Sequence, residues 1–466
     1  MKRRDFFTNG SLAMFGTSLI NPFGNQEDNV LSKKERSAKN IIFLVSDGMS
    51  TGTLNMAHLL LQRKEGRQSN WIKLYQENRG KRALMDTSSS NALVTDSAAG
   101  SSAWGGGVKV PNGSLNVNAD GSFNKPILQK FKEAGKAVGC VTTVSITHAT
   151  PAGFCVNNKS RGDEYEIADQ YLDLKFDVMM GGGTKFFSKE SRKDKVDLLE
   201  KYRNAGFTVV QNRDQMLQLN ADKPVLGLYS ENALPYTLDT LHDSSLQKNV
   251  PTLAEMTQKT ISLLSQNNKG FVMQVEGGKV DWAAHANDTA GLLYDQIAFD
   301  DAVKVALDFA EKDKDTLVIM TTDHGNGNPG LFGNDSGFDK IQHFKHTNDW
   351  ILNGITNKFT TAQVIERIEA AQGYAIKVAE AETLLTAYTK HNGDGLYNPY
   401  KLPFQQLGQI QSSYISVNWA SMGHSGDFVE LAAFGPGSEL IMPFVKNSDL
   451  HNLMLHVTEV ASVSLK

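Results

Sequence analysis

The stretch NIIFLVSDG, residues 40–48, decides the fold of this chain. Its centre, from Ile41 to Val45, is apolar at every position and has the length of one strand. A strand that is apolar on both faces is typical of a parallel sheet covered by helices on each side. The run ends in a polar turn that carries Asp47 and Gly48.

Three later runs have the same form. They are VGCVTTVSITHATPAG (residues 138–153), GFVMQVEGG (270–278) and DTLVIMTTDHGNG (315–327). Helical patterns lie between the runs, and in residues 288–312 the apolar side chains recur near helical spacing. This alternation predicts the α/β class, and we expect a three-layer α/β/α sandwich with a large, mostly parallel central sheet.

Each of these runs ends in residues that can bind a metal ion. In open parallel sheets, ligands bind at the carboxyl ends of the strands. The residues that we expect at that edge are Asp47, His148, Thr150, Glu276, Asp323 and His324. A single Asp after a strand usually forms a turn or caps a helix, but four such strand ends together predict a shared metal site.

Two further signals point to the same site. In EGGKVDWAAHAND (residues 276–288), Asp281 and His285 are four apart and would share one helical face, although such a pair is also often a surface hydrogen bond. His424 lies in a glycine-rich turn before another apolar run, SMGHSGDFVELAAFGPG (421–437). Sets of imidazole and carboxylate groups suit zinc, whereas oxygen ligands alone suit magnesium.

The composition excludes some classes of function and leaves others open. The net charge of -4 gives no electrostatic case for binding nucleic acid.

Residues 1–26 resemble an export signal of the twin-arginine type, because Arg3 and Arg4 precede two phenylalanines and an uncharged run; a chance basic tail is the alternative. No later run is long and apolar enough to span a bilayer. The two cysteines, Cys140 and Cys155, could form a disulfide or remain separate buried thiols.

The stretch VTDSAAGSSAW, residues 94–104, surrounds Ser97 with small residues and one carboxylate. An isolated Asp-Ser pair usually lies in a flexible loop. Together with the runs above, however, it resembles the nucleophile motif of the alkaline phosphatases, which are metal-dependent phosphomonoesterases. The resemblance covers most of the chain after the signal, with the motifs in the family's order.

The resemblance implies a role for each candidate residue. Ser97 would be the nucleophile at the start of a helix, Arg161 would bind phosphate, and Asp96 would hold Arg161. Two zinc ions and one magnesium ion would be bound by Asp281, His285 and His424, by Asp47, Asp323 and His324, and by Asp47, Thr150 and Glu276. His148 and Trp282 stand at two positions that vary within the family, and this combination is similar to cold-adapted and marine bacterial members.

The resemblance also implies one domain over residues 38–466, with a cap inserted at about 326–420, and a homodimer. The expected export signal implies a periplasmic or secreted location. Within the insertion we expect residues 327–354 to be loop-like and residues 360–390 to contain helices. The expected reaction is hydrolysis of phosphate monoesters through a phosphoserine. The alternatives are a phosphodiesterase or sulfatase of the same superfamily, and a non-catalytic exported protein that binds phosphate or zinc.

Overall fold

The computed structural model describes residues 37–220, 223–388 and 401–461. The expected export signal, residues 1–26, lies outside these ranges. Among the described residues, no helix combines the length and the apolar character that a bilayer crossing requires.

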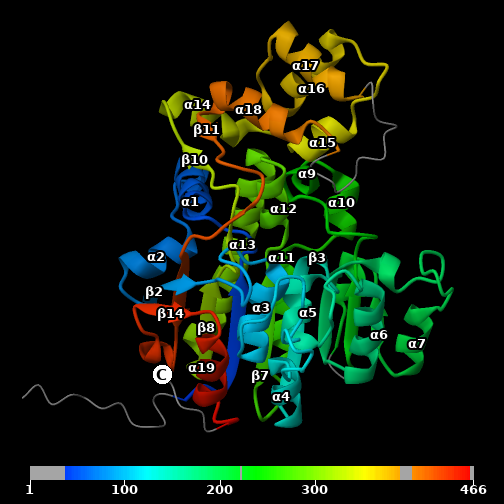
Figure 1. Cartoon of the computed structure of the whole chain (residues 1–466), viewed down its shortest axis with the longest axis vertical. Coiled ribbons are helices and arrows are strands. Elements are labelled where there is room, and N and C mark those ends of the chain that lie inside the picture. Colours follow the sequence, from blue (N-terminus) through cyan, green and yellow to red (C-terminus); the bar gives the residue numbers. More distant parts are fainter. Residues whose placement is uncertain (1–36, 221–222, 389–400, 462–466) are drawn as a thin grey trace, which may run out of the picture.

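A ten-stranded sheet forms the centre of the molecule (Figure 1). In spatial order its strands are β14 (Phe444–Lys446), β2 (Lys81–Asp86), β13 (Val429–Phe434), β8 (Thr316–Thr321), β1 (Asn40–Val45), β7 (Phe271–Glu276), β3 (Ala137–Ser145), β4 (Val178–Gly182), β6 (Val225–Leu228) and β5 (Thr208–Val210). Only β13 pairs antiparallel with its neighbours in this sheet. The other pairings are parallel, as the apolar runs predicted.

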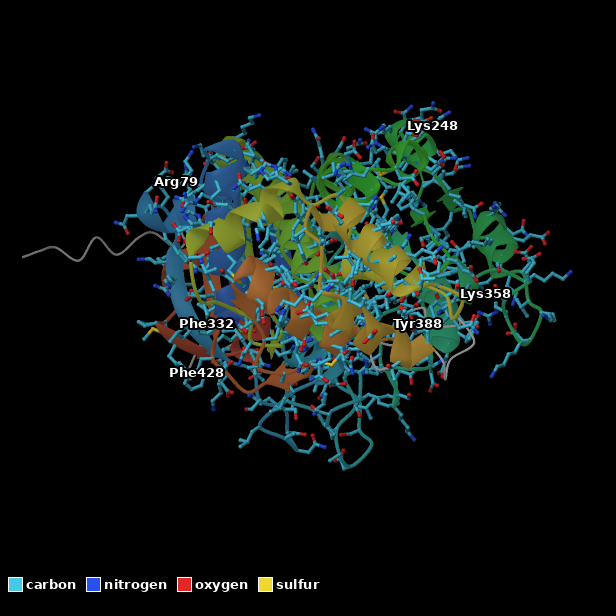
Figure 2. The ribbon with its side chains drawn as sticks, turned by 90° about the horizontal axis from the view of Figure 1, so that it is seen from above. Arg79, Lys248, Phe332, Lys358, Tyr388 and Phe428 are labelled. Carbon is cyan, nitrogen blue, oxygen red and sulfur yellow. The ribbon has the colours of Figure 1, made fainter. Side chains whose placement is uncertain are left out.

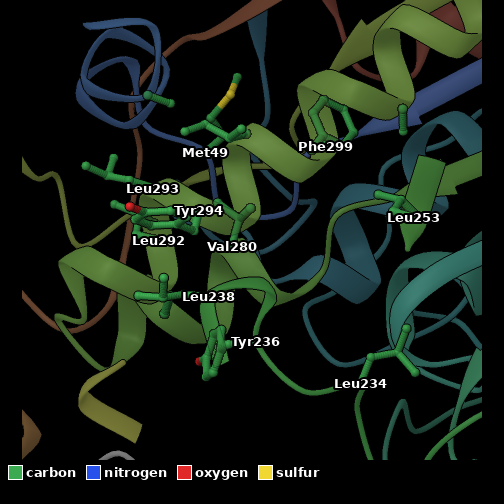
Figure 3. Packing of buried hydrophobic residues seen from close by; sticks show 14 of the residues in the cluster. Met49, Leu234, Tyr236, Leu238, Leu253, Val280, Leu292, Leu293, Tyr294 and Phe299 are labelled. Carbon is green, nitrogen blue, oxygen red and sulfur yellow. The ribbon is translucent and has the colours of Figure 1, made fainter. Parts of the chain in front are cut away.

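Side chains of β1 alternate between two hydrophobic clusters, one on each face of the sheet. Ile42 and Leu44 belong to one cluster, and Ile41, Phe43 and Val45 to the other. The first cluster receives side chains from α1 (Thr51–Glu65), α2 (Asn70–Gln76), α8 (Arg213–Leu217), α9 (Thr237–Leu241), α11 (Leu253–Leu264), α12 (Lys279–His285) and α13 (Thr289–Asp313). Figure 3 shows part of this packing, including Val280 of α12 and Phe299 of α13.

The second cluster is covered by a different set of helices. They are α3 (Ser97–Gly106), α4 (Ile127–Glu133), α5 (Ala149–Cys155), α6 (Glu164–Leu174), α7 (Leu198–Asn204) and α19 (Asp449–Val457). The central sheet therefore has helices on both faces, and the prediction of a three-layer sandwich is confirmed. The helix expected over residues 288–312 is also confirmed by α13, and the Asp288 side chain caps it by accepting a hydrogen bond from the Gly291 N–H.

A helical insertion lies at one end of the molecule, and two short antiparallel ladders pair the segments that lead into it and out of it (Figure 1). β9 (Gly325–Asn326) pairs with β12 (His424–Ser425), and β10 (Gly330–Leu331) pairs with β11 (Val417–Asn418). The insertion contains α14 (Asp335–Asp339), α15 (Asn348–Asn353), α16 (Thr361–Gln372), α17 (Val378–Tyr388) and α18 (Phe404–Ile415). The ladders bring its two ends together at the edge of the domain.

The expectation of a loop over residues 327–354 is wrong, because this stretch contains α14 and α15. Both helices are short, and both begin at a side-chain cap: Asn334 accepts from the Gly337 N–H and Thr347 from the Trp350 N–H. Buried contacts stabilise turns that propensity alone would leave unfolded. The helical pattern of residues 360–390 is confirmed by α16 and α17; residues 389 and 390 lie outside the described ranges.

Candidate active site

The four strands that carry the expected chelators are neighbours in the sheet, in the order β8, β1, β7 and β3. Their ends are also in register: Val45 lies beside Thr321 on one side and beside Glu276 on the other. The residues that follow these strands therefore meet at one edge. Asp47, Asp323, His324 and Glu276 are fully buried there, in a part of the molecule where parallel sheets bind their ligands.

Ser97 lies at the first position of α3, next to this edge. The Asp96 side chain caps the helix by accepting a hydrogen bond from the Ala99 N–H at 3.0 Å. The Ser97 Oγ lies 3.3 Å from Nε2 of His324. The serine hydroxyl is thus placed at a helix N-terminus, where backbone N–H groups and the helix dipole favour an anion.

The small residues after Ser97 allow a close approach of two helices and a strand end. A Cβ added to Gly105 of α3 would lie 2.0 Å from the Gly153 carbonyl oxygen of α5. A Cβ added to Gly100 would meet the Asp323 Cβ at 3.1 Å. Larger side chains at these positions would move Ser97 away from the chelators.

One group of possible ligands lies directly beside Ser97. The His324 Nε2 is 3.7 Å from Asp47 Oδ1 and 3.3 Å from Asp323 Oδ2. Ligand atoms of these three residues lie within 4.8 Å of one another. Two carboxylates and one imidazole at this spacing match the donor set that zinc prefers.

A second group consists of Asp281, His285 and His424. The Nε2 atoms of the two histidines lie 3.0 Å apart, and Asp281 oxygens lie 3.5 Å from His285 Nε2 and 3.7 Å from His424 Nε2. The other ring nitrogens, Nδ1, face the carbonyl oxygens of Met422 at 2.7 Å and Thr95 at 2.9 Å.

These carbonyl contacts determine the tautomer of both rings. A carbonyl oxygen can only accept, so each Nδ1 carries the proton and each Nε2 presents a lone pair. Two facing lone pairs repel unless a cation lies between them.

The Asn326 side chain, which the sequence did not single out, donates to Asp281 Oδ1 at 2.7 Å and orients that carboxylate.

The third group lies on the other side of Asp47. The Thr150 hydroxyl donates to Asp47 Oδ2 at 3.1 Å, and the Thr142 hydroxyl, another residue that the sequence did not single out, donates to Glu276. His148 also belongs here: its Nδ1 lies 4.0 Å from Glu276 Oε1, and ligand atoms of Asp47, His148 and Glu276 lie within 4.8 Å of one another.

The buried carboxylates lack enough partners for their charge. Among the described residues, Asp47 Oδ1, Asp323 Oδ2 and Glu276 Oε1 are buried without a hydrogen-bond partner. Burial raises the pKa of Asp47 well above its ordinary value, with a further rise from the charge of Asp323. Burial likewise raises the pKa of Glu276 to about 8. Unpaired buried carboxylates are costly, so the donor set fits bound cations.

Arg161 is held by two contacts. Its Nη1 donates to Asp96 Oδ2 at 3.1 Å, and its Nη2 donates to His148 Nε2 at 3.2 Å. Burial raises the pKa of Asp96, but the charge of Arg161 and hydrogen bonds from two backbone N–H groups outweigh it, so the pKa is below its ordinary value. The two contacts thereby orient the guanidinium.

A pocket of about 200 Å³ opens beside Arg161. Arg161, His148, Asp281, Trp282 and His285 line it, and the sequence had marked all five. The pocket also includes residues that the sequence did not mark: Tyr236, Lys279, Ala286, Asp349 and Phe404. The last two belong to the insertion, so their contribution depends on tertiary contacts that no local pattern reveals.

Cys140 lies in β3 and Cys155 at the end of α5. The two Sγ atoms are 3.6 Å apart, and both residues are free thiols with no exposed surface.

The sequence matches the alkaline phosphatase family model over residues 38–460. Among curated proteins, it is similar to alkaline phosphatase 4 of Bacillus subtilis, with 32% identity over 445 residues, 93% of this chain and 92% of the relative. Alkaline phosphatase of Escherichia coli is 33% identical over 335 residues, which cover 63% of this chain and 71% of that protein.

Solved structures give the same result. The alkaline phosphatase of Thermus thermophilus superposes with a TM-score of 0.85 at 31% identity, covering 91% of this chain and 92% of that one. A cold-active enzyme from the psychrophile Shewanella sp. gives a TM-score of 0.76 at 26% identity, with 91% and 100% coverage. The chain therefore belongs to the alkaline phosphatase family and is a phosphomonoester hydrolase.

Proposed function

We propose that this hydrolase acts through a covalent phosphoserine formed at Ser97. The observation that carries the proposal is the position of the Ser97 hydroxyl: at a helix N-terminus, 3.3 Å from His324 Nε2, and beside buried carboxylates that lack partners. The Ser97 hydroxyl would lose its proton to solvent, and its oxygen would form a bond to phosphorus as the bond to the ester oxygen breaks; the ester oxygen would take up a proton and leave as the alcohol. Water would then hydrolyse the phosphoserine and release inorganic phosphate.

Arg161 would bind the phosphoryl group during both steps. A guanidinium can donate two parallel hydrogen bonds to two phosphate oxygens, which a lysine cannot reproduce. Asp96 would hold Arg161 in place while capping the helix that carries Ser97. The same carboxylate thus couples the position of the nucleophile to the position of the group that binds its substrate.

The donor sets support the expected cofactors. Asp281, His285 and His424 would hold one zinc ion, and Asp47, Asp323 and His324 a second. Asp47, Thr150 and Glu276 would hold magnesium, with His148 close by. When bound, these cations would neutralise the charge of the carboxylates and lower the pKa of the serine hydroxyl and of water. A variant of the alkaline phosphatase from the Antarctic bacterium TAB5, 27% identical to this chain, is described with Mg bound in its M3 site.

Replacement of the nucleophile tests the proposal. Ser97→Ala should abolish formation of a phosphorylated protein, detected by intact mass after acid quenching, and should reduce kcat for p-nitrophenyl phosphate by several orders of magnitude. Ser101→Ala is a matched control, because Ser101 is buried one turn later on the same helix and contacts the Ala98 and Ala149 carbonyls instead. Phosphoserine that persists in Ser97→Ala would disprove the assignment.

The remaining alternatives differ in their preferred ester. A phosphodiesterase or sulfatase would turn over bis(p-nitrophenyl) phosphate or p-nitrophenyl sulfate faster than the monoester. Arg161 and the third group of ligands favour a dianionic monoester over either substrate. A non-catalytic binding protein would hold zinc and phosphate with no turnover of any of the three.

We also infer one domain over residues 38–466 with a cap inserted at about 326–420, export by the twin-arginine route to the periplasm or outside the cell, and a homodimer.

An exposed apolar edge of the sheet supports the dimer. Phe428 and Phe444 pack together with ring centroids 5.0 Å apart, Phe444 lies in register with Leu84, and all three are 41% to 56% exposed. Figure 2 shows Phe428 at the outer margin of the molecule. Analytical ultracentrifugation should give twice the chain mass, and Phe428→Ser should shift it toward the monomer.

A further inference from the structure

The pocket beside Arg161 extends well beyond the groups that would hold the phosphate. Its lining includes Arg161, His148, Asp281 and His285. The other lining residues are Tyr236, Lys279, Trp282, Ala286, Asp349 and Phe404, and among them Lys279 lies against the Tyr236 and Trp282 rings; we call these six the second end of the pocket. A phosphate monoester bound at Arg161 would place its alcohol against these residues.

A single helix, α12, supplies side chains to both ends. Asp281 and His285 are four apart and form one stripe, toward the proposed zinc ligands. Lys279 and Trp282 of α12 and Ala286, the residue that follows the helix, are three and four apart and form an adjacent stripe along the second end. The spacing between the reacting centre and this wall is therefore fixed by one rigid element.

The second end has aromatic walls and two opposite charges. Tyr236, Trp282 and Phe404 provide three rings, and the Lys279 Nζ lies 3.4 Å from the centroid of the Tyr236 ring and 5.0 Å from that of Trp282. Asp349 provides the negative charge. Figure 3 shows Tyr236 next to Leu238 at the start of α9. The lysine ammonium already occupies the cation-π position, so the rings do not form a cage for a second cation.

These charges determine which alcohols the pocket would favour. Lys279 and Asp349 attract each other, so their opposite charges partly offset. A charged group on the alcohol would be attracted by one of them and repelled by the other, whereas a neutral group leaves the pair undisturbed. Among neutral groups, a flat ring gains most from walls made of aromatic side chains, because it can stack on them or meet their edges.

The part of the wall that the insertion supplies is held firmly to the core. Asp288 accepts hydrogen bonds from the Asn348 N–H at 2.8 Å and from the Asp349 N–H at 3.3 Å. Asp239 accepts from the Thr347 N–H at 3.1 Å and from its hydroxyl at 2.6 Å. The first turn of α15 is thus fixed by two carboxylates of the main domain. Such a wall is organised before the substrate arrives.

We propose that the second end of the pocket is a leaving-group subsite for monoesters whose alcohol carries a neutral, flat heteroaromatic ring, as a nucleoside monophosphate does. Trp282 and Phe404 are its specificity-determining residues, and the offsetting charges of Lys279 and Asp349 give no net preference for a charged alcohol. The inference rests on the proposed function, since it takes the phosphate to be bound at Arg161.

The experiment compares two substrates that leave as primary alcohols and differ in the ring. The ratio of kcat/KM for AMP to that for glycerol 3-phosphate is measured in the metal-loaded enzyme and in Trp282→Leu and Phe404→Leu. Leucine keeps much of the buried volume but removes the flat face. Each substitution should lower the ratio about fivefold or more. Phe332→Leu is the matched control, because Phe332 also lies in the insertion but is 64% exposed and does not line the pocket; its ratio should not change.

A binding measurement separates this subsite from the catalytic proposal. In the Ser97→Ala protein, calorimetry should give a lower Kd for AMP than for glycerol 3-phosphate, and Phe404→Leu in that background should remove most of the difference. An unchanged ratio in both leucine variants, or equal Kd values for the two esters, would overturn the subsite. Absence of turnover of both esters by the unmodified enzyme would instead overturn the proposed function. In that case the difference in Kd between AMP and glycerol 3-phosphate would still show whether the subsite exists.

Discussion

Cys140 and Cys155 provide a prediction whose magnitude follows from their separation in the chain. Their Sγ atoms are 3.6 Å apart, so a disulfide of about 2.05 Å requires the two atoms to approach by roughly 1.5 Å. Neither residue has exposed surface, and burial raises the pKa of the Cys155 thiol well above its ordinary value, with a further rise from Cys140. A buried, protonated thiol reacts slowly with oxidants.

The folding route therefore decides the redox state. A chain that folds before export, as the proposed twin-arginine route implies, would bury both thiols in a reducing compartment. We expect the native protein to contain two free thiols and the protein refolded under oxidising conditions to contain the bridge. Closing a loop between residues 15 apart should stabilise the refolded protein by about 3 kcal/mol. For 466 residues with an unfolding entropy of about 2.1 cal/mol/K each, this corresponds to a rise in Tm of about 3 °C.

Two measurements check this expectation. Denaturation in iodoacetamide followed by mass spectrometry should find two alkylated cysteines in the native protein and none after oxidative refolding. Calorimetry should find the rise in Tm in the refolded protein, and Cys155→Ala treated in the same two ways should show no difference. A native exported protein that cannot be alkylated would refute the argument from burial and folding order.

Three further outcomes follow from the structure. Asp96→Ala should lower the free energy of unfolding by about 1 kcal/mol, because the helix cap is lost. Because Arg161 also loses the carboxylate that holds it, the same variant should raise KM and weaken inhibition by inorganic phosphate at least fivefold. Asp96→Glu should restore little of the stability or of the phosphate binding if the position of the carboxylate matters as much as its charge. Burial lowers the pKa of Lys136 from 10.5 to about 8, so the unfolded chain binds more protons than the folded chain between these two pH values. The contribution of Lys136 to the free energy of unfolding should therefore increase as the pH rises from about 8 to 10.5. Urea titrations across this range should show the increase, and Lys136→Met should remove it. Removal of divalent cations with a chelator should abolish turnover of p-nitrophenyl phosphate, and zinc with magnesium should restore it more fully than either ion alone.

The strands and their polar ends could be predicted because both depend on local sequence. Residues 41–45 are apolar on both faces of β1, and a strand of that kind must lie inside a covered sheet. Asp47 and Glu276 then meet because parallel strands share their carboxyl edge. The start of α3 at Ser97 and the shared face of Asp281 and His285 likewise follow from spacing within a single element.

The rest depends on contacts between distant segments. Lys279 is an ordinary helical lysine in the sequence, but in the fold it is buried and lies against the Tyr236 ring, which comes from a loop far earlier in the chain. Phe404 lines the pocket because the insertion returns toward α12. The direction of β13 was equally hidden, since an apolar run has the same pattern in either orientation and its partners are chosen by the sheet.

The geometry of α12 links the chemistry of the site to its selectivity. Asp281 and His285 cannot be moved without displacing Lys279 and Trp282, because all four lie within two turns of one helix. The carboxylate and imidazole must face His424 for the proposed zinc to be held, and this requirement leaves the adjacent stripe facing the pocket. Substitutions on that stripe can therefore change which alcohol is accepted while the chelators stay in place. Substitutions that rotate the helix would change the metal affinity and the choice of alcohol together. A variant that loses selectivity for the ring but keeps its metal affinity would show that only the stripe of Lys279 and Trp282 had been changed.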